Sequence, residues 1–167
     1  MLIRKATRDD VPQITGIYNY YVLNTHITFD LEAVSLNNRL TWMEQFNNEK
    51  HLLFVGTEAD KVIGYACSTR FRTKPAYDLS VESTIYLDPA HTGTGAGAAL
   101  YNHLLDALHK AEVHRCYGVI ALPNDASVAL HRKLGFKETG LLTEVGYKFD
   151  QYWDTLWMER EFRGSSG

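Results

Sequence analysis

The sequence has few cysteines and no recognisable metal-binding cluster. Its 167 residues include two cysteines, Cys67 and Cys116, which stand singly. Without a CxxC pair, neither a disulfide framework nor a thiolate metal site is indicated. The seven histidines are scattered, and none has ligand spacing with a carboxylate or a cysteine. We therefore expect no metal.

A strong basic charge and a long apolar run are also missing. The formal net charge is −3 and no polybasic stretch occurs, which argues against binding to nucleic acid or to an anionic membrane. Nowhere do 18 apolar residues run together, and the first residues lack the apolar region of a signal peptide. We expect a cytoplasmic protein in which any anionic ligand is held by a local site.

The apolar pattern indicates one domain over residues 1–163. Glycine and serine at 164–167 predict a flexible tail, either native or added in cloning. We predict helices from Thr7 through Tyr21 and over 35–46, 98–111 and 126–134, and strands over 2–6, 52–57, 62–71, 80–87, 117–122, 136–145 and 149–161. In the second helix, Leu36, Leu40, Met43 and Phe46 form the expected buried stripe. This order predicts an α/β (mixed α+β) domain with a mostly antiparallel mixed sheet flanked by helices.

A glycine-rich segment, His91-Thr92-Gly93-Thr94-Gly95-Ala96-Gly97, lies between a predicted strand and a helix. Glycines there allow a tight turn, and the helix N-terminus adds free N–H groups, so the segment can bind a diphosphate. A Walker A loop would end in Gly-Lys-Ser/Thr, and a dinucleotide loop would read G-x-G-x-x-G, so neither matches. By spacing alone, a connection without a ligand stays open.

The surrounding segments resemble the GCN5-related N-acetyltransferase (GNAT) superfamily over nearly the whole chain. The glycines match its cofactor loop, Ile85-Tyr86-Leu87-Asp88-Pro89 its central strand, and 124–136 its second signature. Segments 17–22, 28–30, 71–77, 81–86, 146–149 and 153–155 are similar to the phosphinothricin and methionine sulfone/sulfoximine acetyltransferase group. Several separated segments in the right order are more specific than one glycine loop.

The resemblance implies acetyl-CoA as the donor and a set of residues that would bind it. The central strand would pair with the pantetheine, the glycine loop would hold the pyrophosphate, and Asn124 would bond the pantetheine beside the helix 127–133. The implied residues are Ile85, Tyr86, Leu87, Thr92, Gly93, Thr94, Gly95, Ala96, Gly97, Ala98, Asn124, Ser127 and Lys133.

Four positions depart from the family pattern. Thr92 and Thr94 stand where the family has arginines, which removes two charge-assisted phosphate contacts. We therefore expect backbone N–H groups, threonine hydroxyls and the helix dipole to hold the pyrophosphate, with a weak dependence on salt. Lys74 replaces an arginine of the substrate loop, and His131 stands where the superfamily prefers tyrosine.

Acetyl transfer requires a neutral amine, although an α-amino group has a pKa of about 8, so a base must take its proton. Glu82 is the candidate base, because it lies in the central strand and alternation places it on one face with Thr84 and Tyr86. The alternative is that Glu82 pairs with a cation on a solvated face. By the resemblance, the Leu87 N–H or a neighbouring one would stabilise the thioester oxygen, and His131 is the candidate acid for the leaving thiolate. A histidine with no catalytic role is the other possibility at 131.

Arg72 and Lys74 would bind an acidic group of the acceptor, and the full set of implied substrate residues is Phe29, Arg72, Lys74, Tyr77, Ser83 and Thr84. The expected function is acetyl-CoA-dependent N-acetylation of a small amino acid or analogue: phosphinothricin, methionine sulfoximine or methionine sulfone. Acetylation of protein N-termini or polyamines, and a non-catalytic CoA-binding regulatory module, are the alternatives. Aromatic residues in the last two strands predict a homodimer.

Overall fold

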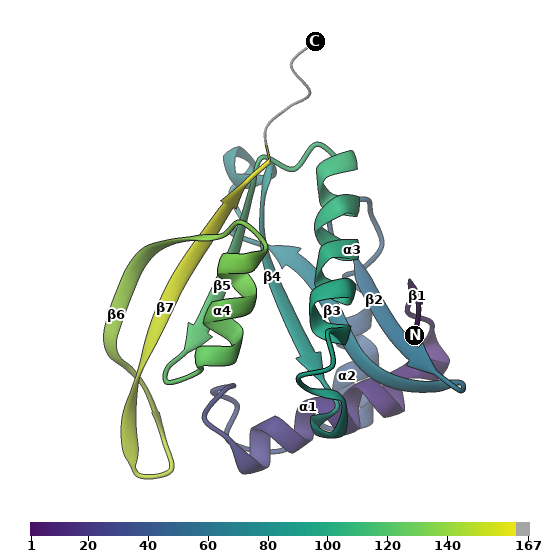
Figure 1. The fold of residues 1–167 in the computed structure, drawn as a ribbon, viewed down its shortest axis with the longest axis horizontal. Coiled ribbons are helices and arrows are strands. Elements are labelled where there is room, and N and C mark those ends of the chain that lie inside the picture. The colour runs from purple at the N-terminus through teal and green to yellow at the C-terminus, as the bar shows by residue number, and fades with distance from the viewer. Residues whose placement is uncertain (163–167) are drawn as a thin grey trace.

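The computed structural model describes residues 1–162, so the predicted tail at 164–167 lies outside the described residues. Seven strands form one sheet in the order β1-β2-β3-β4-β5-β7-β6, in which only β4 and β5 are parallel (Figure 1). The strands are β1 (Leu2–Lys5), β2 (Leu53–Glu58), β3 (Lys61–Arg70), β4 (Ser80–Leu87), β5 (Arg115–Ala121), β6 (Lys137–Lys148) and β7 (Gln151–Glu161). The predicted fold class is confirmed.

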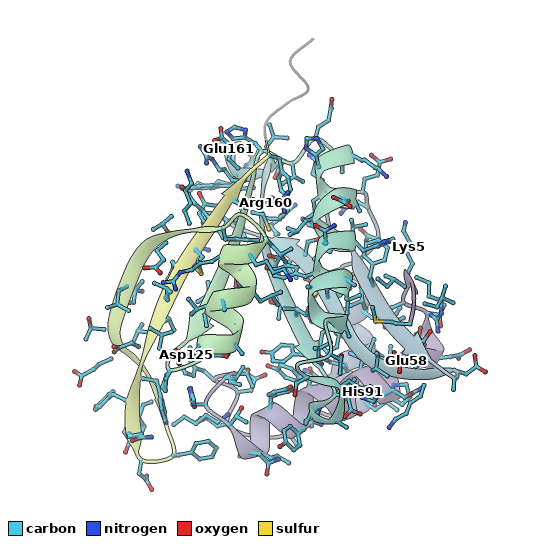
Figure 2. All side chains as sticks on the ribbon, viewed as in Figure 1. Lys5, Glu58, His91, Asp125, Arg160 and Glu161 are labelled. Carbon is cyan, nitrogen blue, oxygen red and sulfur yellow. The ribbon has the colours of Figure 1, made fainter. Side chains whose placement is uncertain are left out.

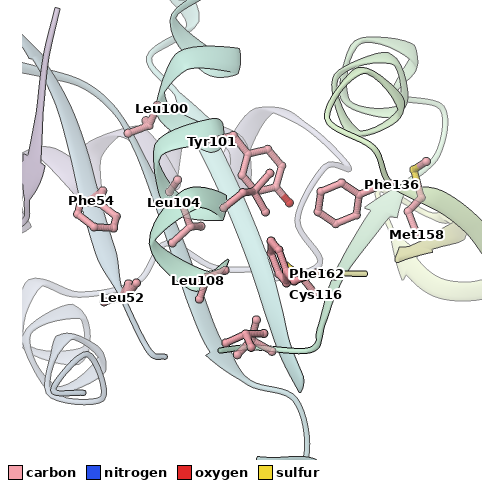
Figure 3. Packing of buried hydrophobic residues seen from close by; sticks show 14 of the residues in the cluster. Leu52, Phe54, Leu100, Tyr101, Leu104, Leu108, Cys116, Phe136, Met158 and Phe162 are labelled. Carbon is pink, nitrogen blue, oxygen red and sulfur yellow. The ribbon is translucent and has the colours of Figure 1, made fainter. Parts of the chain in front are cut away.

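Helices cover both faces of this sheet. The α-helices are α1 (Val11–Asn24), α2 (Leu36–Met43), α3 (Ala96–Lys110) and α4 (Asp125–Lys133), and the short 3₁₀ turns are η1 (Arg8–Asp10), η2 (Pro75–Tyr77) and η3 (Pro89–His91). On one face, α3 buries a leucine stripe in a cluster that includes residues of β2, β3, β4, β5 and β7 (Figure 3). The stripe is Leu100, Leu104, Leu105 and Leu108, at the spacing of an amphipathic helix. On the other face, α1 packs on β2 and β3.

The second helix differs from its prediction. It ends at Met43 rather than Phe46, and Leu36, expected in a buried stripe, is exposed. The buried residue of α2 is Arg39. Its guanidinium lies 4.1 Å from the ring centroid of Tyr18 and 3.9 Å from that of Trp42, and donates to the Tyr65 hydroxyl at 2.8 Å. Attraction to two aromatic faces offsets part of the cost of burying this cation.

The last strand pair also differs in its limits. Strand β6 continues to Lys148, three residues past its predicted end, and Phe149 and Asp150 form the tight turn to β7. The ammonium group of Lys148 is buried. It donates a 2.8 Å hydrogen bond to the carbonyl oxygen of Thr28, in the segment after α1. This contact joins the hairpin end to the α1–α2 connection.

Candidate active site

The central feature of the site is a V-shaped opening between β4 and β5. These two strands pair over three residues each, Ser80–Glu82 with Arg115–Tyr117, and then diverge toward their carboxyl ends (Figure 1). Figure 2 shows that His91, before α3, and Asp125, at the start of α4, lie toward the same open end. Ligands commonly bind where neighbouring parallel strands separate.

The free half of β4 presents backbone groups to this opening. The Asp88 N–H donates to Ile63 of β3 at 2.8 Å. Since alternate residues of an antiparallel strand point to the same neighbour, the N–H and C=O groups of Ile85 and Leu87 point away from β3, toward the opening. The Leu87 carbonyl accepts a 2.7 Å hydrogen bond from the Tyr21 hydroxyl. The Leu87 N–H and both groups of Ile85 are therefore directed toward a ligand in the opening.

The glycine loop closes one end of the opening. Gly93 and Gly95 have φ values of +74° and +88°, which other residues rarely adopt. Helix α3 begins at Ala96 with Gly95 as its N-cap, and no side chain accepts from the N–H groups of Gly97 and Ala98 among the described residues. These N–H groups and the positive end of the helix dipole form a site suited to phosphate.

The threonines of this loop do not act as expected. The Thr92 hydroxyl donates to the carbonyl of Pro89 at 3.1 Å, and the Thr94 hydroxyl donates to that of His91 at 2.9 Å. A hydroxyl has one hydrogen, so neither can donate to phosphate in this conformation. The expectation that threonine hydroxyls hold the pyrophosphate is wrong for this structure, which leaves the backbone N–H groups as the available donors in the loop.

Helix α4 forms the opposite wall. The side-chain oxygen of Asn124, its N-cap, accepts from the Ser127 N–H at 3.2 Å, as N-cap residues usually do. The NH₂ group of the Asn124 side chain then remains available to donate to a ligand. Lys133 is exposed at the far end of α4 and also lines the opening.

Together these walls enclose a groove of about 720 Å³, a size typical of small-molecule sites. It is lined by Tyr21, Ile27, Ser83, Thr84, Ile85, Tyr86, Leu87, Thr92, Gly93, Gly95, Gly97, Ala98, Val119, Ile120, Ala121, Asn124, Ala126, Ser127, Ala129, Leu130, His131 and Lys133. Eleven of the thirteen predicted cofactor residues belong to this lining. Thr94 and Ala96 lie in the same loop.

Glu82 lies in β4 at the apex of the V, where it is cross-strand neighbour to Thr69 and Tyr117. Burial raises the pKa of its carboxyl group, and nearby Arg72 opposes this effect. Over residues 1–162, no side chain or backbone group forms a hydrogen bond or ion pair with this carboxylate. A half-buried carboxylate without a partner, whose pKa is raised toward neutrality, has the properties of a general base.

The substrate loop 71–79 lies beside this carboxylate. Phe71 stacks on Tyr117 with ring centroids 4.6 Å apart and contacts Tyr77 at 5.7 Å. The Arg72 guanidinium lies 4.3 Å from the Phe71 ring and is exposed, as is Lys74. Aromatic stacking therefore holds the base of the loop in place while its two cations face solvent, with Arg72 near Glu82.

Three other predicted substrate residues lie at different places. Thr84 shares the Glu82 face of β4, and Phe29 packs its ring directly on the backbone of Gly146, where a Cβ atom would collide with it. Ser83 is buried on the opposite face, with its hydroxyl 2.7 Å from that of Tyr101. Because this hydroxyl is occupied within the protein, we do not retain Ser83 as a substrate contact.

His131 does not fit the role of acid. It is 4% exposed, and burial lowers its pKa, so the ring is neutral. Nδ1 lies 2.8 Å from the Ser127 carbonyl oxygen and Nε2 lies 3.1 Å from the Tyr101 hydroxyl. A carbonyl accepts only, so the single ring hydrogen is on Nδ1 and no proton is free for a leaving thiolate. We therefore do not assign a proton transfer to His131.

Tyr21, beside β4, and Arg39, behind Tyr65, had no predicted role in the site. Tyr21 bonds Leu87, and Tyr86 packs between the rings of Tyr21 at 5.2 Å and Tyr18 at 5.3 Å. The spacing of Tyr18 and Tyr21 predicts one helix face, but it does not predict which strand that face contacts. Arg39, behind Tyr65, had no distinguishing signal in the sequence.

The fold and groove are those of an acyl-CoA-dependent acetyltransferase domain, and comparison with known proteins agrees. A family model described as "Acetyltransferase (GNAT) domain" matches residues 3–157. The chain belongs to the GNAT acetyltransferase family, and the predicted family and enzyme class are confirmed.

Individual relatives are similar over nearly their full length. A phosphinothricin N-acetyltransferase of Streptomyces coelicolor is 42% identical, over 95% of this chain and 94% of the relative. The solved phosphinothricin acetyltransferase of Sinorhizobium meliloti, in complex with acetyl-CoA, is 31% identical with a TM-score of 0.93, covering 99% of this chain and 94% of its own. A solved ribosomal-protein-alanine N-acetyltransferase of Brucella melitensis is 35% identical with the same TM-score, covering 96% and 99%. The predicted donor, acetyl-CoA, agrees with the complex.

Within residues 1–162 no helix is both long and apolar enough to cross a membrane, and no group of three or more His, Cys, Asp or Glu side chains could hold a metal ion. The two cysteines are buried and free.

Proposed function

We propose that this protein transfers the acetyl group of acetyl-CoA to the amine of a small amino acid or analogue, with Glu82 as the base. The observation that carries the proposal is the half-buried Glu82 carboxylate at the point where β4 and β5 separate, which forms no hydrogen bond or ion pair within residues 1–162 and lies near the exposed Arg72. Phosphinothricin, methionine sulfoximine and methionine sulfone are the proposed acceptors. The name of the Streptomyces relative supports the first of them.

The groove residues fit acetyl-CoA. The backbone groups of Ile85 would pair with an extended pantetheine, whose amides need such partners. The loop N–H groups of Gly97 and Ala98 suit the pyrophosphate, and Lys133 adds a point charge. Acetyl-CoA supplies the acetyl thioester.

Glu82 would accept the proton of the acceptor ammonium group, directly or through one water. The free amine then forms the bond to the acetyl carbon and the bond from that carbon to sulfur breaks. The nitrogen, positively charged after the attack, loses one proton to give the amide, and the departing thiolate takes up that proton, directly or through water. The Leu87 N–H would donate to the thioester oxygen as negative charge develops on it. No histidine acid is required in this sequence of steps.

The acceptor would lie between Glu82 and the exposed cations. Arg72 offers a planar fork for a carboxylate or phosphinate, and Lys74 a mobile point charge. The rings of Phe29 and Tyr77 would form side walls, and Thr84 shares the Glu82 face. Cations at this position disfavour a polyamine acceptor because of like-charge repulsion.

Thiol release measures this activity directly. Purified protein with acetyl-CoA should release free CoA thiol when given phosphinothricin, methionine sulfone or methionine sulfoximine, and much less with spermidine or with a peptide beginning with alanine. If only the peptide is acetylated, the acceptor is a protein N-terminus and not a small amino acid. Binding of acetyl-CoA by calorimetry without turnover on any amine would favour a non-catalytic module.

We also propose a homodimer formed through the β6–β7 hairpin. Strand β6 is an edge of the sheet, and the hairpin exposes large apolar side chains: Leu141, Val145, Tyr147, Phe149 and Tyr152. An exposed edge strand with apolar side chains favours pairing with another chain. Light scattering after size exclusion should give about twice the 19.0 kDa chain mass, and a monomer would contradict the dimer. The expected cytoplasmic location stays a prediction.

A further inference from the structure

A line of buried polar side chains crosses the apex of the V. Cys116 of β5, Ser83 of β4, Tyr101 of α3 and His131 of α4 are each 4% exposed or less. Figure 3 shows Tyr101 and Cys116 within the buried cluster between α3 and the sheet. Each of the four comes from a different element, and all four elements form walls of the groove. Buried polar groups in such a position need hydrogen-bond partners.

The direction of every hydrogen bond in this line follows from one carbonyl group. The Ser127 carbonyl oxygen can only accept a hydrogen bond, so His131 Nδ1 donates to it at 2.8 Å and Nε2 is left as an acceptor. The Tyr101 hydroxyl therefore donates to Nε2 at 3.1 Å. Having used its hydrogen, that hydroxyl accepts from Ser83 at 2.7 Å.

The line ends at Cys116. Its thiol donates to the Ser83 oxygen at 3.0 Å. Burial raises the pKa of Cys116 to about 12, so the sulfur keeps its hydrogen. Ser83 also has a longer contact of 3.3 Å with the Tyr117 carbonyl, the last β5 residue paired with β4. The four groups thus donate in one direction, from β5 to α4, and all are neutral near pH 7.

The imidazole also fills space at the point where the strands separate. Gly118 follows the last paired residue of β5, and a Cβ atom there would lie 2.5 Å from His131 Nε2. The ring therefore rests against the β5 backbone, and it contacts Phe136 at a centroid distance of 4.9 Å. On its other side it holds the first turn of α4 through the Ser127 carbonyl, three residues after Asn124.

We propose that His131 is a positioning residue for acetyl-CoA, which acts by joining the four walls of the groove through the Cys116–Ser83–Tyr101–His131 hydrogen bonds. The ring fixes the distance between β5 and α4. It thereby fixes the position of Asn124, the N-cap of α4, and of Ser127 in the first turn of that helix. The proposal rests on the proposed use of the groove for acetyl-CoA. It differs from a catalytic role because the histidine transfers no proton.

Substitution and binding test this role. His131→Asn and Tyr101→Phe should each raise the Kd of acetyl-CoA about tenfold, because each leaves buried polar groups without a partner. At saturating acetyl-CoA, kcat should fall less than about threefold, and the pH profile of kcat should keep its shape. His109→Asn, at an exposed histidine of α3, is the matched control and should equal the wild type.

Opposite results would overturn the proposal. An unchanged Kd with kcat reduced more than about a hundredfold and a lost basic limb of the pH profile would make His131 the acid. If Kd and kcat are unchanged in both His131→Asn and Tyr101→Phe, the hydrogen bonds of Tyr101 and His131 do not position the groove for acetyl-CoA. If wild-type protein binds no acetyl-CoA, the proposed function itself fails, which is a different outcome.

A measurement on the unmodified protein covers the case in which the variants fail to fold. Nitrogen-15 NMR of the histidine rings should show His131 as the neutral tautomer with hydrogen on Nδ1, in free protein and with acetyl-CoA bound. Hydrogen on Nε2, or a doubly protonated ring near pH 7, would contradict the direction of the bonds and overturn the proposal.

Discussion

The Tyr21 hydroxyl donates a 2.7 Å hydrogen bond to the carbonyl oxygen of Leu87, 66 residues away in the sequence. On the other side of the same peptide group, the Asp88 N–H donates to Ile63. The peptide at the end of β4 is therefore fixed from both sides, by α1 and by β3. This arrangement sets the direction of the neighbouring Leu87 N–H, which we assign to the thioester oxygen.

Tyr21→Phe should lower kcat/KM about fivefold, because one hydrogen bond of about 1 kcal/mol no longer holds this peptide in place. Steady-state kinetics with acetyl-CoA and the best acceptor provide the measurement. The exposed neighbour Tyr20 supplies the control variant Tyr20→Phe, which should behave as wild type. Equal activity of both variants would show that the contact does not affect the reaction.

Glu82→Gln should lower kcat by roughly 10²–10⁴, the usual contribution of a general base. In the wild type, kcat/KM should rise with pH as the carboxyl group ionises, with a midpoint above the ordinary value because burial raises its pKa. The variant should lose this acidic limb. Glu32→Gln, at an exposed carboxylate, is the control. A wild-type rate in Glu82→Gln would remove Glu82 from the mechanism.

The same variant should be more stable than the wild type at neutral pH. A raised pKa means that the folded state binds the proton more tightly than the unfolded state, so stability falls as pH rises from the unfolded pKa through the folded one. Glutamine carries no charge to bury. The melting temperature of Glu82→Gln should exceed that of wild type at pH 7, and the difference should shrink below about pH 4.3, the unperturbed pKa of glutamate. A lower melting temperature at pH 7 would contradict the burial of a charge.

The double variant Thr92→Arg, Thr94→Arg should bind acetyl-CoA more tightly than the wild type at low salt, and its affinity should depend on salt. We expect the wild-type loop to bind phosphate through its N–H groups, since both threonine hydroxyls donate to carbonyl oxygens. Charge-assisted bonds to phosphate are stronger but are screened by salt when exposed. Titration calorimetry at several salt concentrations should give a steeper slope for the double variant. A steep slope in the wild type would mean that further basic side chains, besides Lys133, already reach the phosphates.

Gly146→Ala should displace the Phe29 ring, because the added Cβ would collide with it. Overpacking of this kind costs about 1–3 kcal/mol of stability, and the acceptor KM should rise while the Kd of acetyl-CoA stays the same. Gly140, also in β6, has open space at its Cβ position, so Gly140→Ala is the matched control. If Gly146→Ala leaves the acceptor KM unchanged, Phe29 is not a wall of the acceptor site.

Much of the site follows from short-range features of the sequence. The glycines at 93 and 95 adopt positive φ values that favour glycine, and an amphipathic helix follows them directly, so a phosphate-binding turn could be predicted there. Alternation along 80–87 predicts that Glu82 and Thr84 share a face, and the structure agrees. In each case the physical cause lies within a few residues of the chain.

The contacts that decide the chemistry join distant segments, and only the tertiary structure shows them. A histidine at 131 has two possible tautomers, and the Ser127 carbonyl and the Tyr101 hydroxyl select one of them. Arg39 is buried, against expectation, because rings from α1 and β3 enclose it.

Periodicity therefore determined which face of α3 is apolar, and the glycines showed where the turn before it lies. It could not determine which residues meet across two faces, because that depends on how helices and strands pack together. Packing left Glu82 without a partner and gave His131 two, and this difference separates the proposed base from the proposed positioning residue.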